Sequence, residues 1–235
     1  MTAIAGEVDD DWLVCFPEKA IAGVVAYVAK SWAELVTSYP GAHHAGEYEP
    51  ALTKSLADYL DDPKQRRAAA MGGRFHAERP INHRRNGKPK QSGRTDVEYH
   101  YPAPGSAALT LEFKKLKGTS NCRNDYRNSG MTRFINGPYA SNEPSGVMCG
   151  MVTVDLATEV EAMRTSLARC KKRLACVPTT TGTVASDNQD VAPDALLFET
   201  HHSRSDGAST IRLSHLFIPL ATAPLAASVT NEPAN

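Results

Sequence analysis

Hydrophobic residues recur with a helical period in three parts of the chain. Residues 17–35 carry apolar side chains at three- and four-residue steps, which predicts an amphipathic helix that packs on a sheet. A second helix is predicted from about Pro50, because proline suits the first helical turn and the leucines after it share one stripe. Residues 156–174 show the same period and end in basic residues, which favours a third helix.

Strand patterns occupy the middle and the end of the chain. Residues 94–101 and 107–114 alternate polar and apolar side chains, and the Pro- and Gly-containing turn between them predicts an antiparallel hairpin. Residues 147–154 form a nearly continuous apolar run, as expected of a strand covered on both faces. Residues 195–200 and 211–220 predict two more strands. This order indicates an α/β fold with a central mixed β-sheet flanked by helices on both faces.

The remaining segments have weaker patterns. Residues 72–93 hold glycine, proline and many basic side chains, which predicts a mobile connection with room for a short strand. Residues 121–135 predict a helix that is basic on one side, and residues 178–193 predict a surface loop. We expect residues 1–220 to form a single domain and residues 221–235 to form a flexible tail.

Composition excludes several classes of protein. The 235 residues are 41% hydrophobic and 22% charged, which fits one globular domain and neither a fibrous nor a membrane-spanning protein. Five cysteines without Cys-x-x-Cys spacing disfavour a disulfide framework and a structural zinc site. The first residues are acidic and lack the basic and apolar regions of a signal peptide, so we expect a cytoplasmic location.

Basic residues concentrate around the predicted hairpin. Residues 64–133 contain 16 Lys and Arg against 5 Asp and Glu, a net charge of +11, which the rest of the chain balances. Such a stripe attracts phosphate backbones, although a charge run is more often a solvated surface. The candidate nucleic-acid contacts are Arg84, Arg85, Lys88, Lys90, Arg94, Lys115, Tyr126, Arg127 and Arg133.

The hairpin brings together three residues that can carry chemistry. Glu112 and Lys114 face the same side of the second strand, about 7 Å apart along it, and Asp96 comes from the first strand. Two carboxylates suit Mg²⁺, with Mn²⁺ as a substitute, and Lys114 would orient or help deprotonate a water molecule. This set suits metal-assisted phosphodiester hydrolysis. The structural alternative is a solvated hairpin face with a cross-strand salt bridge.

These residues resemble the motif of the PD-(D/E)XK nuclease superfamily, an acidic residue on one strand followed by Glu-x-Lys on the next. Asp96 is followed, after fifteen positions, by Glu112-Phe113-Lys114, and Thr95 stands where the motif has proline. Asp62-Pro63-Lys64 also fits the string. Its proline and its place after a helical pattern disqualify it as a central strand.

The resemblance covers residues 47–175 and implies a restriction-endonuclease-like core. It assigns Asp96 and Glu112 to Mg²⁺ and Lys114 to the attacking water. Many members of the superfamily add a helical glutamate, for which Glu49 is the candidate and Glu47 its neighbour. The alternative for Glu49 is an acid that stabilises the helix dipole.

The implied activity is that of a metal-dependent DNA endonuclease in bacterial or phage defence or restriction. The implied assembly is a homodimer or a higher homo-oligomer, and RNA is a less favoured substrate. Two other classes stay open: a non-catalytic nucleic-acid-binding protein that uses the same basic stripe, and a protein-interaction protein that uses the acidic ends of the chain. The chain lacks the glycine-rich motifs of P-loop and dinucleotide-binding proteins.

Overall fold

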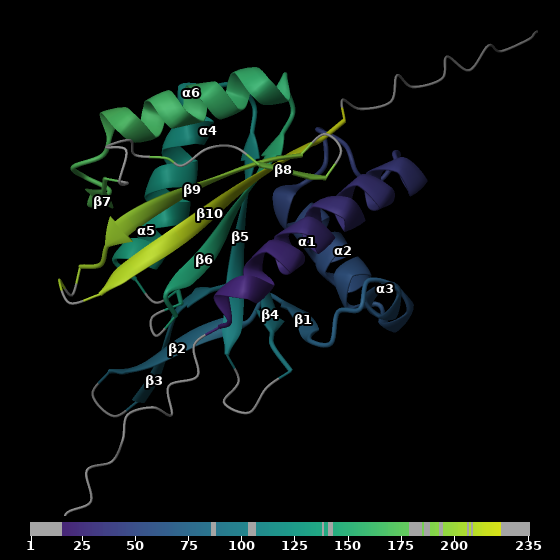
Figure 1. Ribbon diagram of the computed structural model, residues 1–235, viewed down its shortest axis with the longest axis horizontal. Helices are drawn as coiled ribbons and strands as arrows, with labels where there is room; N and C mark the ends of the chain where they lie inside the picture. Colours follow the sequence, from purple (N-terminus) through teal and green to yellow (C-terminus); the bar gives the residue numbers. More distant parts are fainter. Residues whose placement is uncertain are drawn as a thin grey trace, which may run out of the picture.

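The fold is α/β, with one mixed β-sheet between two sets of helices (Figure 1). The computed structural model describes residues 16–85, 88–102, 107–137, 139–140, 143–178, 185, 189–192, 195–205, 207 and 209–221, with side chains described outside 81–93 and 189–192. The predicted α/β class with a central mixed sheet is confirmed. The expected flexible tail lies almost entirely outside the described residues.

Two sets of helices cover the sheet. The first contains α1 (Glu18–Ser38), α2 (Glu49–Asp61) and α3 (Pro63–Ala68). The second contains α4 (Ser120–Asp125), the π-helix η1 (Tyr126–Met131), α5 (Thr132–Ile135) and α6 (Leu156–Arg169). Each set packs against its own hydrophobic cluster, on opposite faces of the sheet.

The strands of the main sheet lie in the order β1-β4-β5-β6-β10-β9-β7, and β8 pairs with β9. Their bounds are β1 (Arg74–Ala77), β4 (Val97–His100), β5 (Ala108–Leu116), β6 (Ser145–Val152), β7 (Cys176–Val177), β8 (Gln189–Ala192), β9 (Ala195–Ser203) and β10 (Thr210–Pro219). A separate antiparallel ribbon contains β2 (Pro80–Arg85) and β3 (Lys88–Arg94). In the main sheet β6 pairs in parallel with both β5 and β10.

The centre of the sheet follows the predicted pattern. All eight residues of β6 are buried, as expected of a strand with parallel neighbours and helices on both faces. The predicted hairpin is confirmed, because β4 and β5 pair antiparallel with Val97 opposite Leu111. The two late strands are β9 and β10, which pair with each other.

The first helix is a core helix of the sheet. Helix α1 has the length and composition of a membrane span, yet half of its most apolar window is buried in the fold. Its Trp32 indole donates a hydrogen bond to the Pro219 carbonyl at the end of β10, over 2.7 Å. These contacts are those of an amphipathic helix packed on a sheet, as predicted.

The structure corrects several element boundaries. The segment 72–93, predicted as a mobile connection, contains β1, β2 and most of β3. The predicted helix over 121–135 is divided into α4, η1 and α5, and the third predicted helix ends at Arg169 instead of residue 174. Within the predicted loop 178–193, residues 189–192 form β8. For the three unpredicted strand pairings, hydrogen bonding to a partner strand overrides the local pattern.

A chain of buried polar side chains crosses the second hydrophobic cluster. His202 Nδ1 lies 2.7 Å from the Leu174 carbonyl, which only accepts, so His202 carries its proton on Nδ1 and accepts at Nε2 from the Thr200 hydroxyl. Thr200 then accepts from His215 Nε2, and His215 Nδ1 accepts from Tyr126. Burial lowers the pKa of both histidines, to about 4 for His202, so both rings are neutral.

Candidate active site

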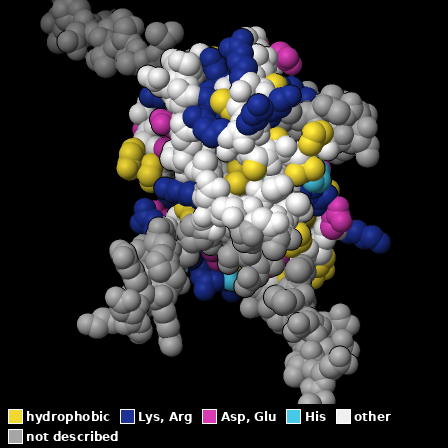
Figure 2. Space-filling view, turned by 90° about the vertical axis from the view of Figure 1, so that its left-hand side faces the viewer, with side chains coloured by type: hydrophobic (Ala, Val, Ile, Leu, Met, Phe, Trp, Pro, Cys, Tyr) yellow, Lys and Arg dark blue, Asp and Glu magenta, His cyan; other side chains and the backbone are white. Residues whose placement is uncertain are grey.

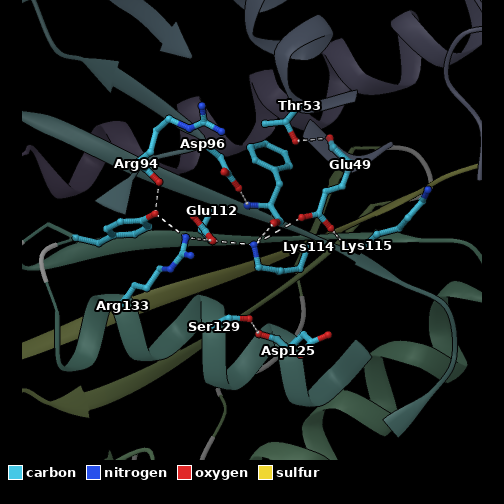
Figure 3. A network of polar contacts seen from close by, with 12 residues as sticks. Glu49, Thr53, Arg94, Asp96, Glu112, Lys114, Lys115, Asp125, Ser129 and Arg133 are labelled. Carbon is cyan, nitrogen blue, oxygen red and sulfur yellow. Dashed lines mark hydrogen bonds and ion pairs between the residues drawn. The ribbon is translucent and has the colours of Figure 1, made fainter. Parts of the chain in front are cut away.

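Strand β5 carries the central ion pair of the site. The Glu112 carboxylate is completely buried, and Lys114 keeps 15% of its side chain exposed. Because the two residues are two positions apart on one strand, they share a face, and Lys114 Nζ donates to Glu112 Oε1 over 2.7 Å (Figure 3). Lys114 Nζ also donates to the Phe113 carbonyl, 2.8 Å away. The predicted convergence of these two side chains is confirmed.

Asp96 joins the pair from outside the strand. We predicted it within a strand over 94–101, but it lies in a bend between β3 and β4. Its Oδ2 accepts a hydrogen bond of 2.8 Å from the Phe113 backbone N–H. Since Phe113 lies between Glu112 and Lys114, this bond holds the Asp96 carboxylate beside both, as Figure 3 shows.

Helix α2 supplies a third carboxylate. The helix begins at Glu49, and Glu49 Oε1 lies 3.6 Å from Lys114 Nζ. Glu49 Oε2 accepts from the Lys115 backbone N–H over 2.5 Å. The carboxylate therefore faces β5, as its helical spacing predicts. The Glu47 carboxylate instead lies 3.3 Å from His44 Nε2, and its backbone carbonyl accepts from the Lys115 ammonium.

Two residues close the opposite side of the site. Arg133 Nη1 donates to Glu112 Oε1 over 3.0 Å and to the Tyr139 hydroxyl over 2.7 Å. Tyr139 in turn donates to the Arg94 carbonyl. Arg133 was predicted as a phosphate contact and is brought to the site. Tyr139 was missed, because it follows a glycine-containing turn with no hydrophobic period.

The buried carboxylate of Glu112 is only half satisfied. Its Oε1 receives both Lys114 and Arg133, whereas Oε2 is buried without a hydrogen-bond partner among the described residues. Burial and then the nearby Asp96 charge raise the pKa of Glu112 to about 7, against the opposing effect of the two cations. Burial lowers the pKa of Lys114, but Glu112, Asp96 and Glu49 outweigh it and raise that pKa overall. Lys114 is therefore an ammonium at neutral pH.

The donor set fits a divalent cation in its chemistry. A cation beside Glu112 Oε2 and Asp96 would pair the orphaned oxygen and offset the repulsion between the two carboxylates. Within the described residues, no group of three or more His, Cys, Asp and Glu side chains is arranged to hold a metal ion. An ion at Glu112 and Asp96 would thus need water and backbone oxygens to complete its coordination.

Helix η1 packs closely beneath the carboxylate. A Cβ atom at Gly130 would lie 2.5 Å from Met148 Cε and 3.8 Å from Glu112 Cγ, so the absence of a side chain lets the helix approach β5. A π-helix is uncommon and often occurs at functional sites. No local sequence signal distinguishes this turn from an ordinary helix.

Two predicted phosphate contacts are corrected. Tyr126 is fully buried and belongs to the polar chain with His215. Arg127 is nearly buried, and its guanidinium donates to the backbone carbonyls of Arg123 and Ser166. Both stabilise the packing of η1 and do not face solvent, where a phosphate would approach.

The other predicted contacts have varied surroundings. Arg94 is exposed and lies 3.2 Å from Glu78, while Lys115 contacts the backbone carbonyl of Glu47. The side chains of Arg84, Arg85, Lys88 and Lys90 lie outside the described ones. Basic residues also gather at the end of α6, where Arg169, Lys171, Lys172 and Arg173 are exposed. Their place at a helix C-terminus suits the helix dipole. Figure 2 shows Lys and Arg side chains close together in the upper part of one face.

No family model, curated protein or solved structure matches the chain.

Proposed function

We propose that this protein is a Mg²⁺-dependent nuclease that hydrolyses phosphodiester bonds in DNA on a restriction-endonuclease-like core. The observation that carries the proposal is the buried, half-satisfied Glu112 carboxylate, with Asp96 beside it and the Lys114 ammonium against it. A second carboxylate that raises the pKa of the first weakens a salt bridge whose only role is stability, which favours a functional reason for the cluster.

Each residue has a role that follows from its contacts. Asp96 and Glu112 would hold Mg²⁺ or Mn²⁺, which supplies electrophilic activation of a phosphate and an acidified water when bound. Lys114 donates hydrogen bonds, since its raised pKa keeps it protonated, and thus orients a water or stabilises negative charge on phosphate oxygens. Glu49 holds Lys114 from the opposite side. Arg133 keeps about two fifths of its side chain exposed, so it can also reach a phosphate.

The arrangement of elements supports the proposed core. The antiparallel pair β4–β5 is followed by the parallel strand β6, with helices on both faces and with η1 beside β5. We also propose that the protein belongs to the PD-(D/E)XK superfamily and forms a homo-oligomer. Its proposed role is in defence or restriction, in the cytoplasm.

A second candidate is a non-catalytic nucleic-acid-binding protein. It is favoured by one observation, that Lys114 and Arg133 already occupy Glu112 Oε1 with direct ion pairs. Such a protein would bind DNA through its basic surface and would use the cluster only for stability.

Plasmid cleavage separates the two candidates. We expect the wild-type protein to cleave plasmid DNA in Mg²⁺ and to lose activity in EDTA. Lys114→Ala should lower the cleavage rate about 100-fold or more, because a charge that acts on the reacting phosphate is lost. Lys54→Ala, an exposed lysine on α2 paired with Asp58, is the matched control and should cleave normally.

Circular dichroism spectra of both variants establish that they fold. Wild-type protein that binds plasmid but leaves it intact in both Mg²⁺ and Mn²⁺ would rule out the nuclease and favour the second candidate.

A further inference from the structure

A groove of about 550 Å³ lies next to the candidate site and shares Glu49 with it. Residues 45–50 form one wall, and Lys115 and Lys117 form the other. Glu49 belongs to both places, because one carboxylate oxygen lies near Lys114 in the site and the other accepts from the Lys115 backbone. The volume is within the range of about 300–1,000 Å³ that small-molecule sites occupy.

Tyr48 places an aromatic ring at this groove with little packing of its own. Tyr48 is 73% exposed, whereas Phe113, Tyr126 and Tyr139 are buried in the hydrophobic clusters. The Tyr48 carbonyl accepts from the Ala51 and Leu52 N–H groups, so the backbone is fixed by the start of α2. Among the described residues the ring makes no aromatic or cation–π contact. A fixed backbone and a free ring are suited to stacking on a planar ligand.

The lysines supply positive charge next to that ring. Lys117 is exposed and makes no ion pair within the described part of the chain. The Lys115 ammonium contacts the Glu47 carbonyl, and burial followed by the charge of Lys117 lowers its pKa. The same wall carries two carboxylates. Glu49 accepts from the Lys115 backbone N–H and lies 3.6 Å from the Lys114 ammonium, and Glu47 lies 3.3 Å from the His44 ring. Of the two lysines, Lys117 is the one whose ammonium makes neither an ion pair nor a hydrogen bond with the described residues, so it is the one open to a phosphate.

We propose that this groove binds an unpaired nucleotide next to the bond that is cut, with Tyr48 stacked on its base and Lys117 on its phosphate. An exposed aromatic ring beside a lysine is the combination that holds single strands, since every base offers a π face and every linkage offers a phosphate. A base inside a duplex has both faces covered by its neighbours. The groove thus favours single-stranded, frayed or overhanging ends over intact duplex. This inference rests on the proposed function.

Fluorescence anisotropy tests the groove without cleavage. The probes are a labelled single-stranded oligonucleotide and a blunt duplex of the same sequence, titrated with the full chain in EDTA. Tyr48→Ala should weaken binding of the single strand roughly 5- to 150-fold, the range for losing one base–aromatic stack. Binding of the blunt duplex should change less than twofold.

Matched variants separate stacking from general damage. Tyr48→Phe keeps the ring and should bind like wild type. Tyr39→Ala removes the other exposed tyrosine, 58% exposed at the end of α1, and should also bind like wild type. Lys117→Ala should lower the slope of log Kd against log salt by about 0.7 for the single strand, the change expected for one lost phosphate contact. Lys54→Ala should leave that slope unchanged.

The outcomes for the groove and for the nuclease can be told apart. Equal single-strand affinities of Tyr48→Ala and Tyr39→Ala, or no binding of the single strand by wild type, would overturn the groove. Plasmid cleavage by wild type in Mg²⁺ would then still support the nuclease. Tyr48-dependent binding without cleavage in any divalent metal would keep the groove as a nucleotide site and remove the nuclease.

Discussion

At the scale of single residues, the ion pairs of the site leave one oxygen of the Glu112 carboxylate without a partner among the described residues. Glu112 is held by Lys114 and Arg133 through the same oxygen, and the other oxygen is buried without a hydrogen-bond partner among the described residues. Period two in β5 was enough to predict that Glu112 and Lys114 meet. Arg133 was predicted near the site as a phosphate contact, but its ion pair with Glu112 and the approach of Tyr139 could not be predicted, because both depend on how η1 packs against β6.

The raised pKa of Glu112 gives stability a dependence on pH. In the folded chain without divalent metal this carboxyl has a pKa of about 7, above its ordinary 4.5, so the folded state holds the proton more tightly than the unfolded state. The resulting stabilisation is fully present below pH 4.5 and is lost as the pH rises through 7, by about 3 kcal/mol in total. Urea unfolding in EDTA between pH 4.5 and 8 measures this loss.

Glu112→Gln isolates the contribution of this one group. The variant cannot ionise, so the free energy of unfolding of wild type relative to the variant should fall as the pH rises. Glu34→Gln, at a partly exposed carboxylate on α1, should follow the wild-type profile. Parallel profiles for wild type and Glu112→Gln would contradict the raised pKa.

The series of buried hydrogen bonds from His202 to Tyr126 depends on the Thr200 hydroxyl group. Thr200→Val keeps the shape of the side chain but leaves both His202 Nε2 and His215 Nε2 without a partner. Because each buried polar group left unpaired costs about 1–3 kcal/mol, we expect a loss of roughly 2–5 kcal/mol in the free energy of unfolding. Thr37→Val, where the hydroxyl bonds its own helix at an exposed position, should cost less than about 1 kcal/mol. Similar losses in the free energy of unfolding of the two variants would contradict the role of Thr200 in these hydrogen bonds.

At the scale of elements, the sequence predicted those with a clear hydrophobic period and failed where residues typical of loops are held in strands by pairing. Helix α1, the β4–β5 pair and the buried strand β6 all follow from their hydrophobic patterns. The ribbon β2–β3 did not, because its glycine, proline and asparagine residues favour a loop locally. Its strands exist through pairing with each other. The early end of α6 at Arg169 was missed for a related reason, since apolar residues continue into the turn beyond it and Leu174 is buried there.

Strand β6 needs glycine where neighbouring strands pack their side chains over it. A Cβ atom at Gly150 would lie 2.7 Å from Leu116 and 2.8 Å from Phe217, both in the core. Gly150→Ala should therefore destabilise the fold by about 1–3 kcal/mol through overpacking. Gly23 is the opposite case, since it lies in α1 and a Cβ atom added there would meet nothing within 4 Å. Gly23→Ala should stabilise by about 0.5–1 kcal/mol, and thermal unfolding of both variants measures the contrast. The reverse order of stabilities would contradict the packing.

At the scale of the whole molecule, one sheet joins two hydrophobic clusters. Strands β5, β6 and β10 contribute side chains to both, so neither set of helices keeps its packing surface if the sheet opens. We expect a single cooperative unfolding transition. Trp32 fluorescence in a Trp12→Phe background reports on the cluster of α1, and far-UV circular dichroism reports on all elements. Their urea midpoints should coincide, and separate midpoints would show that the two faces unfold independently.

The hydrogen bond from Phe113 to Asp96 has a consequence for mutagenesis. The Asp96 side chain accepts from a backbone amide of β5 to which a longer β4 could otherwise bond. It thereby limits the β4–β5 pairing, which ends at Val97 and Leu111. Asp96→Ala would leave that amide without its acceptor, so β4 and β5 could pair over a longer stretch and change the geometry of the site. Asp96→Asn keeps an oxygen acceptor for the amide while it deletes the negative charge, and is therefore the substitution that separates anchoring from electrostatics at this position.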